Sequence, residues 1–278
     1  MEYCMICELS KEDFHKCKSI INGAGQLEVK AIVEGINPGR IFVDHPISPT
    51  TGLVWLGNND GFVFIGNEHN DAFNYEINGF LDLVIAPEAR KVGLEWFEGL
   101  GNHQGWDTVI EKLFTSRNLK SWNQKVYTLS KTTYKEKSYS MEKGYTVTKI
   151  SSELLKDSSI KNMDFLRLKV SEFWTSSESF LNTGKGYCVL FNNMIVSICL
   201  SGFVVENIHC IAIETFKGHR GRKLGQVVAH YFVKDCLENG NIPYWDCMEE
   251  NWPSVAIAEN LGFENVFDYK GYYFKLKD

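Results

Sequence analysis

Ile211-Ala-Ile-Glu-Thr215, followed by Arg220-Gly-Arg-Lys-Leu-Gly225, is the stretch that decides the fold of this chain. The first run is apolar and typical of a buried strand, whereas the second is basic, contains glycine and opens a helix-patterned segment. A strand that runs through such a loop into a helix leaves the first helical amides without intrahelical partners, and they point at whatever lies in front of the helix. The pattern therefore predicts a cradle for an anion.

Residue size and charge in the loop agree with a phosphate ligand. Gly221 and Gly225 carry no side chain, so the backbone there can approach phosphate oxygens closely. Arg220, Arg222 and Lys223 add positive charge. Taken alone, the same loop is equally compatible with a solvated helix cap.

The residues after the loop predict a parallel βαβ unit. Apolar side chains recur at three- and four-residue spacing until Asn239-Gly240, as expected for a helix that packs one face on a sheet; they are Leu224, Val227, Val228, Tyr231, Phe232 and Cys236. The apolar run from Ile242 to Cys247 reads as the next strand. A ligand of such a unit binds at the carboxyl ends of its strands.

On these residues, the chain resembles the GNAT superfamily of acyl-CoA-dependent N-acyltransferases. Arg220 and Gly225 match the ends of the family's pyrophosphate loop, whereas Lys223 stands where the family usually has glycine. The stretch from Asn251 to Phe263 resembles the second signature, which contacts the pantetheine arm and closes a helix with Leu-Gly-Phe. This resemblance covers roughly the last half of the chain. Ile213-Glu-Thr, Trp245-Asp-Cys and the long amino-terminal half further resemble the zwittermicin-resistance-type acetyltransferases.

The resemblance implies an N-acetyltransferase that moves an acetyl group from acetyl-CoA to a primary amine of a small molecule or peptide. It implies that Asn251 and Ser254 contact the pantetheine arm, and that a backbone N–H near Thr215 or Phe216 holds the oxyanion. The implied pyrophosphate ligands are Arg220, Gly221, Arg222, Lys223, Leu224 and Gly225. Two alternatives stay open: a catalytically inactive acyl-CoA-binding or scaffold protein, and a different enzyme of a phosphate-bearing ligand.

The general base has two candidates. His209 lies eleven positions before Arg220, where several GNAT members carry a Glu or His base, and a histidine is mostly neutral at cellular pH. The alternative is Glu214. In a regular strand the two side chains face opposite sides, so only a bulge would let both serve one site. Either residue is also compatible with a structural role, as a strand-end histidine or a capping carboxylate.

The proton donor for the departing thiolate is less evident, because Ala258 stands where many GNAT members have tyrosine. The resemblance then points to Ser254, which other members with the Asn-x-x-Ser pattern place near the thioester sulfur. Both Asn251 and Ser254 are also suited to stabilising the first turn of a helix.

Composition predicts a cytoplasmic protein that acts as a monomer or homodimer. The 278 residues are 44% hydrophobic and 23% charged, enough for a substantial core. The sequence has neither an apolar run of membrane-spanning length nor a basic signal-peptide start, so we expect no membrane partner. The net charge of −6 argues against nucleic acid and suits a cationic amine.

The cysteines predict no metal site. Most of the eight lie in apolar patterns, where cysteine behaves as a small hydrophobe. Cys4, Cys7, His15 and Cys17 are a possible zinc set, but the second pair has a single intervening residue and lies in a helix-like stretch.

The fold class predicted is α/β, with a mixed GNAT-like sheet and flanking helices at residues 133–278, after a smaller α/β domain at 1–132. The polar, lysine-rich segment Lys131–Lys143 is the expected linker. The first domain has no phosphate loop and is assigned to the acceptor side. Gly52 to Asn59 is spaced like Gly186 to Asn193, which hints at a degenerate GNAT-like copy, although coincidence explains it as well. Other expected elements are a helix at 11–21, a helix at 163–173 and a closing hairpin at 266–276.

Overall fold

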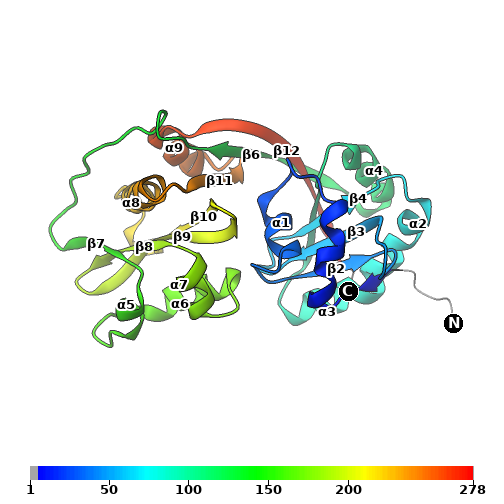
Figure 1. Ribbon diagram of the computed structural model, residues 1–278, viewed down its shortest axis with the longest axis horizontal. Coiled ribbons are helices and arrows are strands. Elements are labelled where there is room, and N and C mark those ends of the chain that lie inside the picture. The colour runs from blue at the N-terminus through cyan, green and yellow to red at the C-terminus, as the bar shows by residue number, and fades with distance from the viewer. Residues whose placement is uncertain (1–5, 278) are drawn as a thin grey trace. The chain divides into compact units, whose positions relative to one another are not determined.

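The computed structural model describes residues 6–277 and divides into two compact units (Figure 1). Unit 1 contains the described residues up to Gln124 and those from Tyr269 onward, and unit 2 spans Lys125–Asp268. The expected boundary after residue 132 and the expected carboxyl-terminal block 133–278 differ from this division. Residues 125–132 belong to unit 2, and the chain returns to unit 1 at Tyr269.

Unit 1 is built on a mixed sheet with the strand order β1-β2-β3-β4-β5-β12. Its pairs are antiparallel except β4–β5, which is parallel. The strands are β1 (Cys7–Glu8), β2 (Gly39–Val43), β3 (Thr51–Leu56), β4 (Phe62–Gly66), β5 (Trp96–Gly101) and β12 (Glu264–Lys275). The helices are η1 (Lys11–Ser19), α1 (Leu27–Val33), α2 (Asp71–Phe80), η2 (Leu81–Ile85), α3 (Ala86–Lys91), α4 (Gly105–Leu113) and η3 (Thr115–Arg117).

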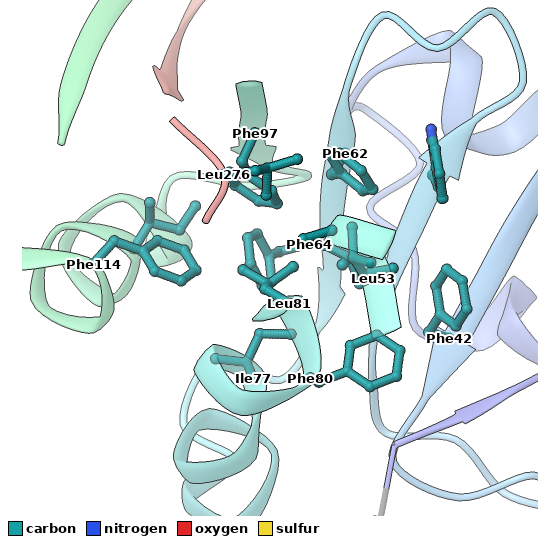
Figure 2. Close-up of a cluster of buried hydrophobic side chains, with 14 of the residues drawn as sticks. Phe42, Leu53, Phe62, Phe64, Ile77, Phe80, Leu81, Phe97, Phe114 and Leu276 are labelled. Carbon is teal, nitrogen blue, oxygen red and sulfur yellow. The ribbon is translucent and has the colours of Figure 1, made fainter. Parts of the chain in front are cut away.

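Aromatic rings fill the core of unit 1. Phe97 stacks on Phe62 at a centroid distance of 4.9 Å and on Phe274 at 4.8 Å. Figure 2 shows this cluster, in which side chains from β3, β4 and β5 pack against Ile77 and Phe80 of α2 and against Phe114. All of these rings are at least 95% buried, so this unit holds its strands and helices together through a continuous aromatic cluster.

Unit 2 is built on parallel and antiparallel strands in the order β6-β11-β10-β9-β8-β7. Its strands are β6 (Lys120–Thr128), β7 (Tyr145–Lys149), β8 (Gly186–Phe191), β9 (Met194–Val205), β10 (Ile208–Thr215) and β11 (Ile242–Met248). The helices are α5 (Ser152–Lys156), α6 (Met163–Phe173), α7 (Ser177–Thr183), η4 (Lys217–His219), α8 (Leu224–Glu238) and α9 (Trp252–Leu261). The predicted α/β class, mixed sheet and flanking helices are confirmed.

The parallel pair β10–β11, linked by α8, is the predicted βαβ unit. Its pairing covers only Ile208 to Cys210 of β10, opposite Ile242 to Tyr244 of β11. Beyond these residues β10 continues on its antiparallel neighbour β9 as far as Thr215. The two parallel strands therefore diverge over the second half of β10.

One predicted local element was wrong, and a second differs in helix type. The expected hairpin at 266–276 is one continuous strand, β12. A Cβ on Gly271 would lie 2.1 Å from the Trp122 ring, so this glycine allows a close approach and makes no turn. The expected helix at 11–21 is the shorter 3₁₀ helix η1.

No helix within residues 6–277 is long and apolar enough to cross a membrane.

Candidate active site

A cleft of about 1220 Å³ opens in unit 2 where β10 and β11 diverge. Ile211, Ile213 and Thr215 line it from β10, and Trp245 and Cys247 line it from β11. Successive residues on one face of a strand lie two positions apart, so these side chains form two facing apolar walls. Because the walls come from the carboxyl-terminal halves of neighbouring parallel strands, the cleft lies where ligands of such sheets bind.

The predicted basic loop forms the polar end of this cleft. Gly221 has φ = 80°, and α8 begins without a side-chain cap or an acidic residue in its first turn. The first amides of α8 thus have no partner inside the helix. A Cβ on Gly225 would lie 3.2 Å from Ile257 and 3.6 Å from the Thr215 hydroxyl, within the cleft wall. The structure gathers the predicted anion ligands around one helix terminus with a favourable dipole.

Lys223 adopts the left-handed conformation, with φ = 59° and ψ = 16°, as the residue that precedes α8. This conformation costs an ordinary side chain about 1 kcal/mol or more, whereas glycine adopts it freely. The family's preference for glycine here thus has a backbone cause, and Lys223 keeps the loop geometry at an energetic cost.

The two other basic residues of the loop have partners within unit 2. Arg220 donates from Nε to the Thr215 carbonyl over 3.0 Å and so ties the loop to the end of β10. Arg222 pairs with Glu142 at 2.7 Å, and its side chain is 45% exposed. Arg222 does not line the cleft, so it would have to leave Glu142 to reach an anion there.

The backbone at the end of β10 corrects one part of the expected oxyanion site. Phe216 donates its N–H to the Val196 carbonyl of β9 over 2.8 Å, so this donor is already used. Alternate residues of a strand direct their N–H groups to opposite edges. The N–H groups of Ile213 and Thr215 therefore face the edge from which β11 has diverged, and Thr215 is the better donor.

Glu214 lies at the cleft and is held by an ion pair. Its Oε2 is 2.9 Å from Lys169 Nζ, which also pairs with Glu172 at 2.7 Å. Burial lowers the pKa of Lys169, but its hydrogen bonds to Glu172 and Glu214 raise that pKa overall, so the ammonium stays charged. The Glu214 side chain is 38% exposed, which leaves room for a water or an amine beside it.

His209 lies elsewhere, which argues against the predicted general base. It is 4% exposed at the other end of β10, and its Nδ1 is 2.9 Å from the Ser201 hydroxyl. It borders a separate cavity of about 470 Å³ with Lys149 and Lys185. Burial, with a contribution from Lys185, lowers the pKa of His209 to about 4.

A bulge in β10 does not bring His209 to the cleft. The pairing with β9 shifts register between His209 and Ile211, so the bulge that the sequence argument required is present. However, five residues at ~3.3 Å each separate His209 from Glu214 by roughly 16 Å along the strand. The structure brings Glu214 and Ser254 to one cleft and leaves His209 outside it.

Asn251 and Ser254 combine structural and cleft-lining positions. The Asn251 side chain caps α9 by accepting from the Ser254 N–H at 3.3 Å. The Ser254 hydroxyl accepts from Trp245 Nε1 over 2.9 Å. This bond leaves the hydroxyl hydrogen unused, and the Cys247 thiol in the cleft wall is one acceptor for it, since burial raises the pKa of that thiol whereas a hydrogen bond from Ser254 lowers it. Ala258 is fully buried, so the position that carries a tyrosine in many relatives of this pattern presents no donor.

Residues 137–140 also line the cleft, although the sequence predicted only a linker there. Nothing in their polar composition distinguishes a linker from a cleft wall, so no sequence signal would have found them. His219, missed as well, lines the cleft and has its Nδ1 2.9 Å from the Tyr145 hydroxyl.

The zinc alternative can be followed only in part, because Cys4 lies outside the described residues. Cys17 is fully buried, and burial raises the pKa of its thiol to about 12. Cys7 is near the Val43 carbonyl, 3.6 Å from its Sγ. Within residues 6–277, no group of three or more His, Cys, Asp or Glu side chains is placed to hold a metal ion.

Comparison with known proteins assigns the chain to a family. Over 268 residues it is 28% identical to YdfB, an uncharacterised N-acetyltransferase of Bacillus subtilis (strain 168), covering 96% of this chain and 97% of the relative. A GCN5-related N-acetyltransferase-like protein from Streptococcus suis 89/1591 shares the fold with a TM-score of 0.66 and 19% identity, covering 95% of this chain and 99% of that one. A GCN5-related N-acetyltransferase from Sphaerobacter thermophilus gives a TM-score of 0.60 at 9% identity, covering 99% and 96%. The GNAT acetyltransferase family model matches residues 18–272. This chain therefore belongs to the GNAT acetyltransferase family.

Proposed function

We propose that the protein transfers the acetyl group of acetyl-CoA to a primary amine of a small molecule or peptide. The observation that carries this proposal is the divergence of β10 from β11 directly in front of the uncapped, basic terminus of α8. An extended thioester with a phosphate-bearing end needs an apolar slot and an anion cradle in line. Unit 2 supplies both in one cleft.

The binding role falls to residues of the loop and of α9. Arg220, Arg222 and the first amides of α8 would hold the pyrophosphate, and the missing side chain of Gly225 leaves space for it. The pantetheine arm would lie between the two walls, within reach of the Asn251 amide. Its N–H₂ group remains available because the capping bond uses only the amide oxygen.

In the reaction, Glu214 first takes one proton from the cationic amine, directly or through one water, and the neutral nitrogen then attacks the thioester carbonyl carbon while the Thr215 N–H donates to the oxyanion. The carbon–sulfur bond then breaks, and the Ser254 hydroxyl stabilises the departing thiolate, which takes up the second proton that the attacking nitrogen loses on becoming an amide. Glu214 replaces His209 as the proposed base because it alone of the two lies at the cleft.

The proposed acceptor is cationic, since the chain carries a net charge of −6 and the proposed base is a carboxylate. The cytoplasm is the proposed location. Seven cysteines, all of those in the described residues, form no disulfide with one another, which suits a reducing compartment.

The buried Ala258 favours a second candidate, an acyl-CoA-binding protein without catalysis, because the usual proton donor is missing. Thiol release from acetyl-CoA, measured on the full chain with a panel of amines, separates the two. Release that depends on one amine class supports the enzyme. Tight binding of acetyl-CoA without release from any amine would favour the binder, and absence of binding would contradict both.

A further inference from the structure

The segment Ser130–Lys143, here called the strap, is fastened to unit 2 along most of its length. It was expected to link two domains, but all of it belongs to unit 2. Backbone, hydrogen-bond and ion-pair contacts hold it: Lys135 N to Leu261 O at 2.9 Å, Tyr134 Oη to His230 Nδ1 at 2.8 Å, Glu136 to Lys234 at 2.6 Å and Glu142 to Arg222 at 2.7 Å. These contacts reach α8, α9 and the phosphate loop.

Between these fixed points, Lys137 to Ser140 form part of the cleft wall. Tyr139 packs its ring edge-on against His230 of α8 at 5.0 Å. Its hydroxyl is buried and hydrogen-bonds to none of the described residues. Burial raises the pKa of this phenol, and an interaction with the Gln226 side chain at hydrogen-bonding reach lowers it. The two groups do not meet in the geometry of a formed hydrogen bond, and the Gln226 amide donates to the Ile257 carbonyl at 3.5 Å.

A buried hydroxyl without a partner costs about 1–3 kcal/mol and is rare in folded proteins. The position of Tyr139 suggests why the cost is tolerated. Gln226 follows Gly225 in the first turn of α8, and Tyr139 lines the same cleft as both of these residues. A phenol donates well to an anionic oxygen, and Lys137 adds a positive charge to the same wall.

We infer that the Tyr139 hydroxyl donates a hydrogen bond to the phosphate-bearing nucleotide half of coenzyme A, which makes the strap a part of the cofactor site. This inference rests on the proposed function, because it takes acetyl-CoA as the ligand of the cleft. It adds a ligand contact from a segment outside the two sequence signatures. The strap then selects complete coenzyme A thioesters over shorter thioesters that carry the same acetyl group.

Two ligands test this selection on the full chain. Acetyl-CoA contains the nucleotide half, whereas S-acetylpantetheine lacks it and retains the thioester and the pantetheine arm. Calorimetry for the first ligand and ligand-observed NMR for the second would give both dissociation constants. The variant is Tyr139→Phe, which removes only the hydroxyl, and the matched control is Tyr231→Phe, a 43% exposed tyrosine of α8 outside the cleft wall.

The expected result is an acetyl-CoA affinity about 10- to 100-fold weaker in Tyr139→Phe, the usual range for one hydrogen bond to a charged group. The affinity for S-acetylpantetheine should stay within about twofold of the wild type, and Tyr231→Phe should change neither. Equal weakening for both ligands would overturn the inference, because the hydroxyl would then act through the fold. Unchanged acetyl-CoA affinity would overturn it as well.

Failure of the proposed function gives a different outcome. A wild-type protein that binds neither ligand would contradict the acetyl-CoA site itself, and the strap contact with it. A wild-type protein that binds acetyl-CoA, with Tyr139→Phe binding it equally well, would leave the proposed function standing and remove the strap from the site.

Discussion

Units 1 and 2 repeat one order of elements but treat the central helix differently. Each has three antiparallel strands, then a helical segment, a parallel strand and another helix: β2-β3-β4, α2 to α3, β5 and α4 in unit 1, and β8-β9-β10, α8, β11 and α9 in unit 2. The element order therefore does not by itself make a site. The two units differ where the third antiparallel strand leads into the following helix.

In unit 1 the helix terminus is closed to anions. The Asn70 side chain caps α2 by accepting from the Phe73 N–H at 3.2 Å, and it donates to Asp44 at 2.9 Å. Asp71 occupies the first turn. In unit 2 no side chain caps α8, and the preceding loop is basic. A capped terminus with two nearby carboxylates repels phosphate, whereas an uncapped basic one attracts it.

The parallel strands differ in the same way. The β4–β5 pairing runs to Gly101, the last residue of β5, and the next residue, Asn102, still donates to Phe64. The β10–β11 pairing stops at Tyr244, although β11 continues to Met248. In unit 1 the parallel strands stay paired beside a cluster of stacked aromatic rings (Figure 2), whereas in unit 2 the parallel strands separate and leave a cleft between them. Divergent strands and an open helix terminus together distinguish the proposed catalytic unit.

The largest expected effect is on the reaction rate, and it concerns Glu214 near the carboxyl-terminal end of β10. Replacing Glu214 by Gln should lower the rate of thiol release at pH 7 by 10²-fold or more, because proton transfer by a positioned base contributes about that much. Part of the loss should return at higher pH, where more of the amine is deprotonated without help. Initial rates from pH 6 to 9 with the best amine of the panel give the profile.

His209→Gln is the matched control, because it changes a titratable residue of the same strand outside the cleft. It should keep the rate within a few-fold of wild type, apart from any loss of folded protein. If Glu214→Gln leaves the rate unchanged while His209→Gln abolishes it, the assignment is reversed, and the general base lies at the amino-terminal end of β10.

A second prediction treats His209 as a core residue whose burial makes stability depend on pH. The pKa falls from an ordinary 6.5 to about 4 in the folded protein. Between these values the unfolded chain binds a proton that the folded chain does not. Stability should thus be complete above pH 6.5, fall as the pH is lowered towards 4, and change no further through this group below pH 4. The loss is about 3 kcal/mol.

Urea unfolding of the wild type and His209→Gln at several pH values tests this linkage. Burial also lowers the pKa of His230, and the carboxylates contribute at lower pH, so only the difference between the two proteins isolates His209. That difference should shrink as the pH falls from 6.5 to 4. A constant difference would show that His209 titrates alike in both states.

A third prediction tests whether the cradle needs an empty position. Gly225→Leu should weaken acetyl-CoA binding at least ~10-fold, equivalent to about 1.4 kcal/mol, because the new side chain meets Ile257 and Thr215 in the cleft wall. Gly79→Leu, at a helix position of unit 1 with open space around it, serves as the matched control. Unchanged affinity in a folded Gly225→Leu protein, measured by calorimetry, would move the pocket elsewhere.

Sequence reasoning found what periodicity and glycine placement encode locally. Helices α6 and α8 and the parallel β10–β11 unit follow from apolar spacing, and the phosphate loop follows from Gly221 and Gly225. His209 was expected at the cleft but lies outside it, because counting along the chain assumed a fixed spacing between the strand and the loop.

The remaining errors depended on partners distant in sequence. Gly271 lies within a strand and leaves room for the Trp122 ring, and no neighbouring residue in the sequence indicates this contact. The likeness of Gly52–Asn59 to Gly186–Asn193 compares β3 with β8, which occupy different places in the repeated order. The repetition of elements is therefore not the one that this likeness suggested. The strap looked like a linker because its contacts are with residues that follow it by 80 to 126 positions.

The smallest expected effect is on the free energy of unfolding, and it concerns the backbone strain at Lys223 just before the uncapped α8. Lys223 holds a left-handed conformation, so Lys223→Gly should relieve about 1–2 kcal/mol of strain and lose part of it to the greater freedom of glycine when unfolded. The net gain in unfolding free energy should be about 0.5–1 kcal/mol, measured by urea unfolding. Lys217→Gly removes the same charge at a position without positive φ and should give no gain. Acetyl-CoA affinity should fall slightly in both variants, because each loses one positive charge near the cradle. If Lys223→Gly instead destabilises the protein while Lys217→Gly does not, the lysine side chain itself holds the loop, and strain is not what this position stores.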